Sequence, residues 1–426
     1  MKQMLVHKEK DRLQIAILDN GRLAEFYMET ADKANQLVGS IFKGRIVNVL
    51  PGMQAAFVDI GLAKNAFLYI DDVLHPHLEQ QPKEKPAITQ LLRAGQGILV
   101  QVVKEPLGGK GARVTTHFSL PGRFLVYMPH AAYVGVSKKV KTEQERARLR
   151  SLGERHREAE EGIILRTAAE SENSDALLAD VRFLRELWQG IQARATDAAV
   201  PAELHREAGL SHRLVRDLLS VELDELWIDD QDFYTETEAL IKQMAPTMQS
   251  RLRLYDQAHA SHSSVGLLNR YQVNHQLQEA FDRRIRLVCG GDLVWDQTEA
   301  LTVIDVNTGR FVGSRDLEDT VFRTNMEAAE QIARLLRLRD IGGIIIIDFI
   351  DMEQETHREQ IARLLEGLLR HDRTKCQVVG WTRLGLLELT RKKVREHAMS
   401  QLLEICPVCK GRGRVNAAKV TGSKTF

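Results

Sequence analysis

Two aspartates that follow apolar runs are the residues of this chain best suited to chemistry. Residues 301–307 place Asp305 near the end of one run, and residues 344–351 place Asp348 directly after four isoleucines. Both runs have the length and composition of buried strands. Because ligands lie beyond the carboxyl ends of the strands in an open α/β sheet, we expect the two carboxylates to lie side by side at one edge of a sheet.

Neighbouring carboxylates repel each other unless a cation lies between them. Oxygen ligands beside a phosphodiester favour Mg²⁺, which could orient a hydroxide for in-line attack and neutralise the charge that develops on phosphorus. Asn307 follows on the same strand and could hydrogen-bond the attacking water or the phosphate. The pattern predicts a magnesium site with Asp305 and Asp348 as ligands. It leaves open the alternative that both aspartates only cap the helices that follow.

Cys406 and Cys409 have the spacing of a metal-binding knuckle. A structural zinc site needs four ligands, and this pair supplies two of them. Cys289 and Cys376 stand alone in apolar, strand-like segments, so we interpret them as core thiols. The same pair from a second chain would complete a Cys₄ site at a two-fold dimer interface. A redox pair is the competing interpretation, but the strand-to-helix context of a thioredoxin-like unit is missing here.

Residues 41–121 contain five short apolar segments with Gly-rich turns between them, which is typical of a small closed barrel such as the OB-fold. Phe57 and Phe67 lie in two of these segments with lysines and arginines nearby, and OB-folds hold single-stranded nucleic acid with such groups. Lys110 lies in a Gly-rich loop that lacks the spacing of a nucleotide-binding P-loop. Core positions for both phenylalanines are the alternative.

The strand-like segment 162–167 ends in Arg166 and Thr167. A guanidinium can hold a terminal phosphate with two parallel hydrogen bonds, and the adjacent hydroxyl offers a further donor. A structural salt bridge is an equally good interpretation of Arg166 at this point.

The elements that must position these residues follow from the spacing of the apolar side chains. An N-terminal hairpin is indicated by apolar alternation on both sides of Asn20 and Gly21. The pattern then predicts helices over 142–161, 175–193, 201–219 and 265–285, with a strand over 223–228. The last part is β-α-β-α-β, with strands 301–306, 343–348 and 376–381 and helices 317–338 and 358–369. This order implies a parallel or mixed sheet covered by helices.

The composition is that of an ordinary globular protein, because the 426 residues carry a net charge of +1 and 43% hydrophobic side chains. Four cysteines are too few for a disulfide framework, and the longest apolar stretch, 341–350, is too short to span a membrane. Residues 391–426 hold nine lysines and arginines against two glutamates, a net charge of +7. A basic end on a slightly acidic body is suited to a polyanion bound at one place.

Together these motifs resemble the bacterial ribonuclease E/G family along nearly the whole chain. The resemblance rests on short segments that occur in a specific order and spacing: 55–59, 166–168, 296–301, 304–307, 347–352, 385–388 and 406–409. It implies a multidomain α+β and α/β fold with six parts. These are an RNase H-like domain split between 1–37 and 212–280, an OB-fold barrel (38–121), a mixed 5′-sensor domain (122–211), a DNase I-like catalytic domain (281–402), a zinc link (403–414) and a basic tail (415–426).

The resemblance also implies roles for individual residues, by motif match. Asp305 and Asp348 would bind magnesium with the assistance of Asn307, and Cys406 and Cys409 would bind zinc shared with a second chain. The RNA-gripping positions of the barrel fall on Phe57, Phe67 and Lys110, and the pocket that reads a 5′-monophosphate falls on Gly122, Val126, Arg166 and Thr167.

The family cuts AU-rich single-stranded RNA to leave 5′-phosphate and 3′-hydroxyl ends, which implies work in rRNA and tRNA maturation and in mRNA decay. Because only residues 414–426 follow Gly413, we expect neither the family's small C-terminal domain nor a degradosome scaffold. We expect a cytoplasmic homodimer without a membrane segment. A non-catalytic RNA-binding regulator is the alternative, disfavoured by the intact Asp305, Asn307 and Asp348; a nucleotide-dependent enzyme is disfavoured by the missing phosphate loop.

Overall fold

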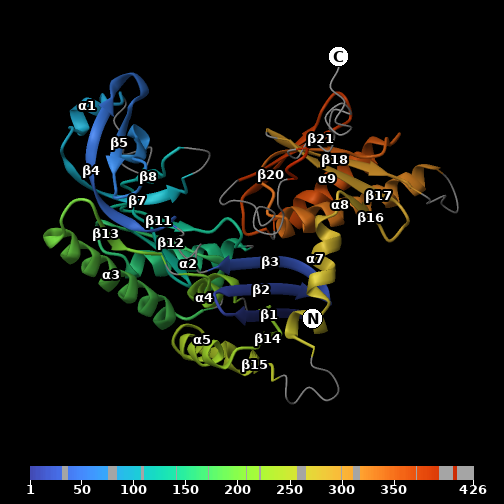
Figure 1. The fold of residues 1–426 in the computed structure, drawn as a ribbon, viewed down its shortest axis with the longest axis horizontal. Helices are drawn as coiled ribbons and strands as arrows, with labels where there is room; N and C mark the ends of the chain where they lie inside the picture. The colour runs from blue at the N-terminus through green and yellow to red at the C-terminus, as the bar shows by residue number, and fades with distance from the viewer. Residues whose placement is uncertain are drawn as a thin grey trace. The chain divides into compact units, whose positions relative to one another are not determined.

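The computed structural model describes residues 1–30, 37–74, 84–106, 110–140, 142–170, 172–207, 209–219, 222–256, 265–298, 300–309, 317–370, 372–392 and 406–409. Over these residues the fold is mixed α+β, with four sheets and the helices packed on them (Figure 1). The chain forms two compact units. One consists of Met1–His7, Gln14–Met28 and Gln257–Phe426, and the other of Lys8–Leu13 and Glu29–Asp256. The six-part division expected from the family resemblance stays a prediction.

The first strands of the chain are β1 (Lys2–Glu9), β2 (Arg12–Asp19) and β3 (Arg22–Thr30), which are neighbours in one sheet. The predicted hairpin is confirmed, because Asn20 and Gly21 take the positive φ values of 48° and 77° that a two-residue turn needs. The sequence reading missed β1. Further along the chain, β14 (Glu225–Ile228) and β15 (Leu252–Leu254) form a parallel pair, and α5 (Gln231–Met244) lies between them in the sequence.

A closed five-stranded barrel follows, as the sequence predicted. Its strands are β4 (Ile41–Leu50), β5 (Ala55–Asp59), β6 (Ala66–Tyr69), β7 (Gly97–Lys104) and β8 (Arg113–Thr115). They neighbour one another in the order β4-β5-β6-β8-β7, and β7 pairs back onto β4 to close an OB-like barrel. Gly44 of β4 leaves room for the side chain of Val58 on β5, since a Cβ on Gly44 would lie 2.6 Å from a Val58 methyl group. The short helix α1 (Ile88–Leu91) precedes β7.

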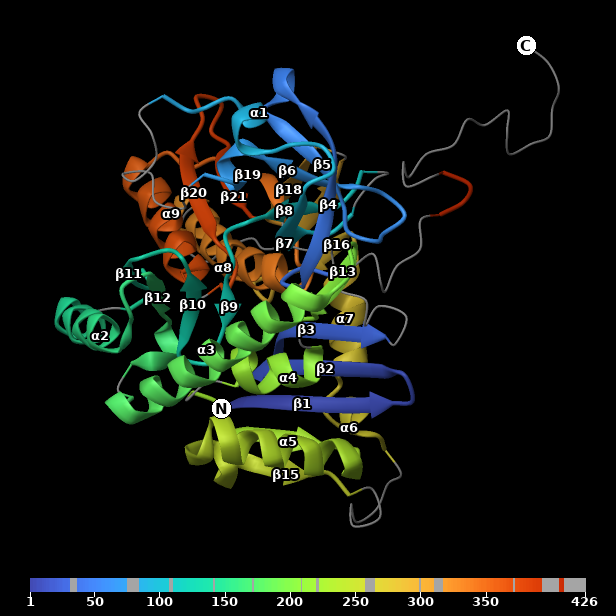
Figure 2. The same cartoon turned by 90° about the vertical axis from the view of Figure 1, so that its left-hand side faces the viewer.

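The next sheet has the order β11-β12-β10-β9, from strands β9 (Leu120–Pro121), β10 (Leu125–Pro129), β11 (Val134–Val136) and β12 (Glu161–Leu165). Helix α2 (Glu143–His156) lies beside β11 and β12 (Figure 2), and α3 (Ser174–Asp197) packs against β9 and β10. Trp188 of α3 and Ile163 of β12 belong to their common apolar core.

The predicted helix over 201–219 is wrong. Its first part is β13 (Ala202–His205), which pairs with β4 of the barrel. A short helical segment follows, with α4 (Leu210–Arg213) continued by a π-helical turn over Leu214–Leu218. Pairing with an available strand edge overrides the local helical pattern here.

The last sheet has the order β16-β17-β18-β19-β21-β20. Its strands are β16 (Arg284–Arg286), β17 (Asp292–Gln297), β18 (Leu301–Asn307), β19 (Gly343–Asp348), β20 (Cys376–Trp381) and β21 (Leu387–Arg391). Strands β18 and β19 are parallel, and the other neighbours are antiparallel. The predicted β-α-β-α-β order is confirmed, with α8 (Leu317–Leu338) and α9 (Glu355–Leu369) as its helices. The sequence reading missed β17 and β21.

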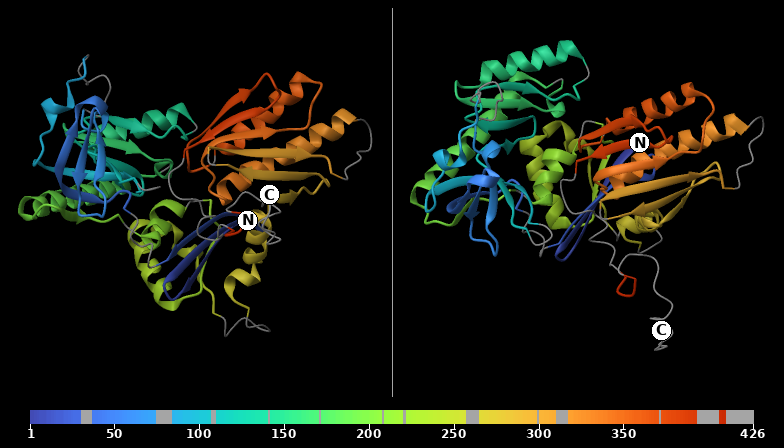
Figure 3. Two further views of the ribbon diagram at one scale, coloured as in Figure 1. Left: turned by 45° about the horizontal axis from the view of Figure 1, so that its top comes forward. Right: turned by 90° about the horizontal axis from the view of Figure 1, so that it is seen from above.

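Helices α8 and α9 lie side by side against this sheet (Figure 3). The predicted helix over 265–285 is instead broken into α6 (Leu267–Arg270) and α7 (Val273–Phe281), because Gln272 between them takes a left-handed conformation at φ 55°. None of the helices in the described ranges combines the length and apolar character needed to cross a membrane.

Candidate active site

Asp305 and Asp348 lie opposite each other on neighbouring strands. The parallel register of β18 and β19 pairs Asp305 with Asp348 directly. Along β18 the side chains of Ile304 and Val306 are buried, whereas Asp305 and Asn307 lie on the other face. The expectation that the two carboxylates are adjacent is therefore met by the backbone geometry. The helix-capping alternative is wrong for Asp348, because α9 begins only at Glu355 with Gln354 as its N-cap residue.

The electrostatics of this pair favour a bound cation. Partial burial raises the pKa of Asp348, and the charges of Asp305 and Asp351 raise it further. Asn307 donates a hydrogen bond of 2.8 Å from Nδ2 to Oδ2 of Asp305, which fixes that carboxylate. Two carboxylates held close together at an unfavourable energy fit a hard divalent cation, which would relieve their repulsion.

The donor set also matches the coordination habit of Mg²⁺. In the described part of the chain, no group of three or more His, Cys, Asp or Glu side chains surrounds a common point. Two carboxylates would leave the remaining positions of an octahedral ion to water or substrate, and Mg²⁺ is commonly held in this way. The residues present therefore fit the metal that the sequence predicted.

Helix α8 supports the segment that follows Asp348. Asn325 exchanges two hydrogen bonds with the backbone of Ile350. Near the start of the helix, Glu318 accepts hydrogen bonds from the backbone N–H groups of Glu353 and Gln354. The sequence reading missed both residues. Asn325 is one of several polar residues on the buried side of α8, together with Thr320, Thr324 and Gln331, so its position in the helix gave no distinct signal.

Phe57 and Phe67 face each other across β5 and β6 on the outside of the barrel. Their ring centroids are 5.5 Å apart and their planes meet at 78°. Both side chains are half-buried, whereas Val58 and Leu68 fill the interior. The alternative that the phenylalanines are core residues is therefore wrong. Tyr69 extends the pair, with its ring centroid 4.4 Å from that of Phe67 and 39% of its surface exposed.

Tyr69 was missed by the sequence reading, although its spacing of two residues from Phe67 places it on the same face of the strand. Cationic groups border these rings. Arg113 is paired with Phe67 in the strand register, lies 5.0 Å over the Tyr69 ring and forms a salt bridge of 2.8 Å with Asp72. Lys110 is exposed, and the loop residues 107–109 before it lie outside the described residues.

The four predicted sensor residues lie on or directly after strands of one sheet, with Val126 in β10, Gly122 after β9, and Arg166 and Thr167 after β12. Antiparallel pairing places Val126 of β10 opposite Ile164 of β12. Arg166 follows β12 and donates a hydrogen bond of 2.6 Å from Nη1 to the carbonyl oxygen of Gly122. Thr167 is exposed, and its hydroxyl lies 3.3 Å from that of Ser137.

Arg166 also forms a salt bridge of 2.7 Å from Nη2 to Oδ1 of Asp217. The salt-bridge interpretation of Arg166 is thus met as well. The sequence reading missed Asp217, which lies 51 residues further along the chain, in the π-helical turn.

The cysteine pair forms a turn whose geometry favours a thiolate. Hydrogen bonds from the backbone N–H groups of Cys409 and Val408, and from the Cys409 side chain, lower the pKa of the Cys406 thiol. The thiolate is the form that binds metals. Burial is the largest cause that raises the pKa of the Cys289 thiol, and it also raises the pKa of Cys376 to about 12. These half-buried thiols therefore stay protonated at neutral pH. The rest of the predicted zinc link, 403–405 and 410–414, lies outside the described residues.

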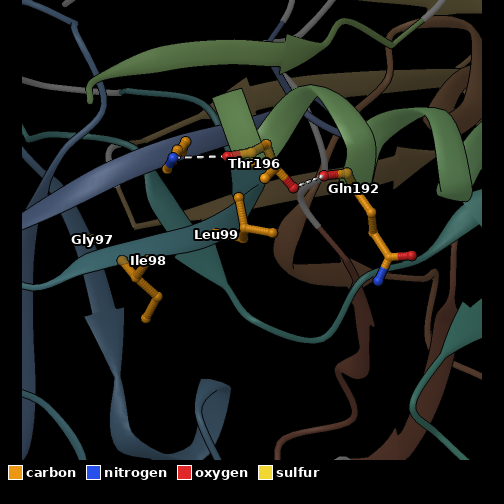
Figure 4. Close-up of a pocket in the computed structure, with 7 residues that line it drawn as sticks. Gly97, Ile98, Leu99, Gln192 and Thr196 are labelled. Carbon is orange, nitrogen blue, oxygen red and sulfur yellow. Dashed lines mark hydrogen bonds between the residues drawn. The ribbon is translucent and has the colours of Figure 1, made fainter. Parts of the chain in front are cut away.

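A pocket of about 350 Å³ lies between the barrel and the end of α3 (Figure 4). Lys43 reaches from β4 to this helix end and donates hydrogen bonds to the carbonyl oxygens of Ala195 at 2.7 Å and Ala198 at 2.8 Å. A lysine at a helix C-terminus stabilises the helix by satisfying its last carbonyls. None of the predicted site residues lines this pocket. Lys43, the charged residue in its lining, joins α3 to the barrel.

Comparison with known proteins identifies the family. The model of the Ribonuclease E/G family matches residues 119–394. Ribonuclease G of Haemophilus influenzae is 42% identical over 98% of this chain and 84% of its own length, and Ribonuclease G of Escherichia coli is 42% identical over 98% and 85%. Ribonuclease E of Escherichia coli is 34% identical over 97% of this chain and 39% of its own length. With its carboxylate pair, outward-facing barrel aromatics and this degree of identity, the chain belongs to the ribonuclease E/G family.

Proposed function

We propose that this protein is a magnesium-dependent endoribonuclease. It hydrolyses single-stranded, AU-rich RNA to leave 5′-phosphate and 3′-hydroxyl ends and is stimulated by a 5′-monophosphate. The observation that carries the proposal is the register that pairs Asp305 with Asp348 on parallel strands, with Asn307 bonded to Asp305. The substrate preference and the roles in rRNA and tRNA maturation and in mRNA decay rest on membership of the family.

Asp305 and Asp348 would hold the magnesium ion, which when bound would activate a water and neutralise charge on the scissile phosphate. Asn307 fixes one oxygen of Asp305, so that carboxylate is oriented before substrate arrives. The second N–H of the Asn307 amide can donate to a non-bridging phosphate oxygen. The side chains of Ile304 in β18 and Ile347 in β19 are fully buried and anchor the two strands that carry the acidic residues.

The barrel supplies a binding surface for a single strand. Phe57, Phe67 and Tyr69 form a continuous aromatic strip on its outside. Bases can stack on such rings irrespective of sequence, and each stacked base is worth about 1–3 kcal/mol. Arg113 beside the strip and the exposed Lys110 would contact the phosphates.

The 5′ end would be read by Arg166 and Thr167. The guanidinium fork matches the oxygens of a monophosphate, whereas a triphosphate is too bulky for a site of this kind. Cys406 and Cys409 of two chains would share a zinc ion and join a homodimer. We propose that the enzyme works in the cytoplasm.

Cleavage of a 5′-labelled single-stranded oligonucleotide tests the proposal. The wild type should cut in Mg²⁺ and not in EDTA, and Asp305→Asn should abolish cutting while retaining RNA affinity. Asp296→Asn is a matched control, because Asp296 lies on the neighbouring strand β17, where it pairs with Arg283. It should cut at the wild-type rate. A wild type that binds the oligonucleotide and never cuts it would leave the non-catalytic RNA-binding regulator as the function.

A further inference from the structure

Asp217 joins two arginines beside the proposed 5′-phosphate pocket. Its Oδ1 accepts a hydrogen bond of 2.7 Å from Nη2 of Arg166. Its Oδ2 accepts hydrogen bonds from Arg216, of 3.1 Å from Nε and 2.8 Å from Nη2. Arg216 forms a further salt bridge with Glu207 and donates to the carbonyl oxygen of Pro121 at 3.4 Å. Through Arg216, the carboxylate of Asp217 therefore connects Pro121 of β9 with Arg166, the residue that follows β12.

These contacts hold the Arg166 guanidinium and still leave it accessible. Within the described residues, Gly122 and Asp217 take up two of the five N–H donors that a guanidinium carries. The side chain of Arg166 is 29% exposed and that of Asp217 is 24% exposed. An arginine that is already held in one orientation loses less rotamer entropy when it binds a phosphate, so its affinity for the phosphate is higher.

The backbone around Gly122, on the other side of Arg166, is also held in place. Asp180 of α3 accepts hydrogen bonds from the backbone N–H groups of Arg123, Phe124 and Leu125. A Cβ on Gly122 would lie 2.5 Å from an oxygen of this carboxylate, so no larger residue fits there. The carbonyl of Gly122, which is the second acceptor for Arg166, is thereby held in place.

The four charged side chains of the group around Asp217 carry no net charge. Arg166 and Arg216 are cations, and Asp217 and Glu207 are anions. Burial alone would raise the pKa of Asp217, but the hydrogen bonds and charges of Arg216 and Arg166 outweigh it and lower that pKa. Asp217 is therefore ionised at neutral pH and keeps two like charges together that would otherwise repel.

We propose that Asp217 is a positioning residue for the recognition of a 5′-monophosphate, acting by fixing the Arg166 guanidinium. The inference rests on the proposed function of the pocket. A carboxylate that merely competed with phosphate for Arg166 would have the opposite effect on the enzyme when removed. The sign of that effect therefore separates positioning from competition.

The test uses the full-length protein with Mg²⁺ and two oligonucleotides of one sequence, with a 5′-monophosphate or a 5′-hydroxyl. The ratio of their kcat/KM values measures recognition of the 5′ end. Asp217→Asn should lower this ratio roughly tenfold, the lower end of the effect of removing a partner that orients a metal ligand. Cleavage of the 5′-hydroxyl oligonucleotide should stay near that of the wild type, whereas the melting temperature should fall because Arg166 and Arg216 lose the anion between them.

Three variants calibrate the result. Arg166→Ala should abolish the preference for the 5′-monophosphate. Asp217→Glu should retain part of that preference because it keeps the carboxylate. Glu154→Gln, which breaks the exposed ion pair with Arg157, should leave the preference unchanged. If Arg166→Ala abolishes the preference for the 5′-monophosphate while Asp217→Asn preserves or increases it, the positioning role of Asp217 is refuted and the proposed phosphate pocket is retained. If Arg166→Ala leaves the ratio intact, the proposed pocket fails and this inference fails with it. An equal loss on both oligonucleotides would show a purely structural role and also refute the inference.

Discussion

Asn325 and Ile350 exchange two hydrogen bonds between helix α8 and the segment that follows β19. Nδ2 of Asn325 donates to the Ile350 carbonyl oxygen at 2.8 Å, and the Ile350 N–H donates to Oδ1 of Asn325 at 3.1 Å. Asn325 is fully buried at 0% exposure. Because Ile350 lies two residues beyond Asp348, the side-chain amide fixes the backbone next to one of the two proposed metal ligands.

Asn325→Leu should therefore lower the cleavage rate as well as the stability. The change leaves a backbone N–H and carbonyl without their partner, which costs about 1–3 kcal/mol for each buried group. We expect a reduced kcat with little change in KM, because the RNA-binding residues are untouched. Gln331→Leu removes a partner of Arg334 from the same helix and serves as the control. Denaturant unfolding and cleavage kinetics would measure both effects, and a wild-type kcat in Asn325→Leu would contradict the prediction.

Asp348→Asn should abolish cleavage yet raise the melting temperature of the metal-free protein at neutral pH. The pKa of Asp348 is raised by burial and by the charges of Asp305 and Asp351, so its ionised form costs stability. That cost is absent below the ordinary aspartate pKa and complete above the raised one, so the gain of the variant should vanish in acid. Added Mg²⁺ should stabilise the wild type and leave Asp348→Asn unchanged in calorimetry. An equal Mg²⁺ response of both proteins would refute metal binding by this pair.

The strongly periodic elements were predictable from the sequence. Helix α8 was expected over 317–338 and has these bounds, and β19 was expected over 343–348 and has these. The helical spacing of apolar residues along α8 indicates a helix, and a short run of β-branched isoleucines favours a strand. The segment 201–219 was predicted wrongly, because its first residues pair with β4, a strand more than 150 residues earlier in the chain. Local periodicity carries no information about such a partner.

The metal site was predictable because Asp305 and Asp348 each follow an apolar run on a strand. The roles of Phe57, Phe67 and the sensor residues were predicted from the family resemblance, and the apolar pattern alone left core positions open for both phenylalanines. Asp217 and Asn325 contact Arg166 and Ile350, which are distant from them in sequence and directly follow strands, so local patterns could not predict either pair. Tyr69 is the exception, since alternation alone would have found it.

Tyr69→Ala should weaken the binding of single-stranded RNA. Its ring continues the strip of Phe57 and Phe67, and loss of one stacking platform costs about 1–3 kcal/mol. Fluorescence anisotropy in an Asp305→Asn background would measure affinity without cleavage. Tyr69→Phe keeps the ring and should bind as the wild type does. Val103→Ala removes an exposed apolar side chain from β7 of the same barrel and should have no effect. Unchanged affinity of Tyr69→Ala would exclude its ring from the RNA surface.

Glu161→Gln should destabilise the protein at neutral pH, and the difference should close in acid. Burial opposes ionisation of Glu161, but hydrogen bonds from Arg185, from the Glu158 N–H and from the Tyr127 hydroxyl outweigh it and lower its pKa below the ordinary glutamate value. A carboxylate with a lowered folded-state pKa contributes stability above the unfolded-state value and loses it as the pH falls through the folded-state value. Loss of the charged acceptor should cost about 2 kcal/mol at pH 7.

Urea unfolding at neutral pH and well below the glutamate pKa would measure that difference. Below the folded-state pKa the wild-type side chain is protonated too, so it and the glutamine should be nearly equivalent. Glu154→Gln breaks only the exposed pair with Arg157 and should change stability by less than about 1 kcal/mol at either pH. A loss in Glu161→Gln that is the same at both pH values would mean that packing around the side chain, and not its charge, stabilises the sheet that carries Arg166.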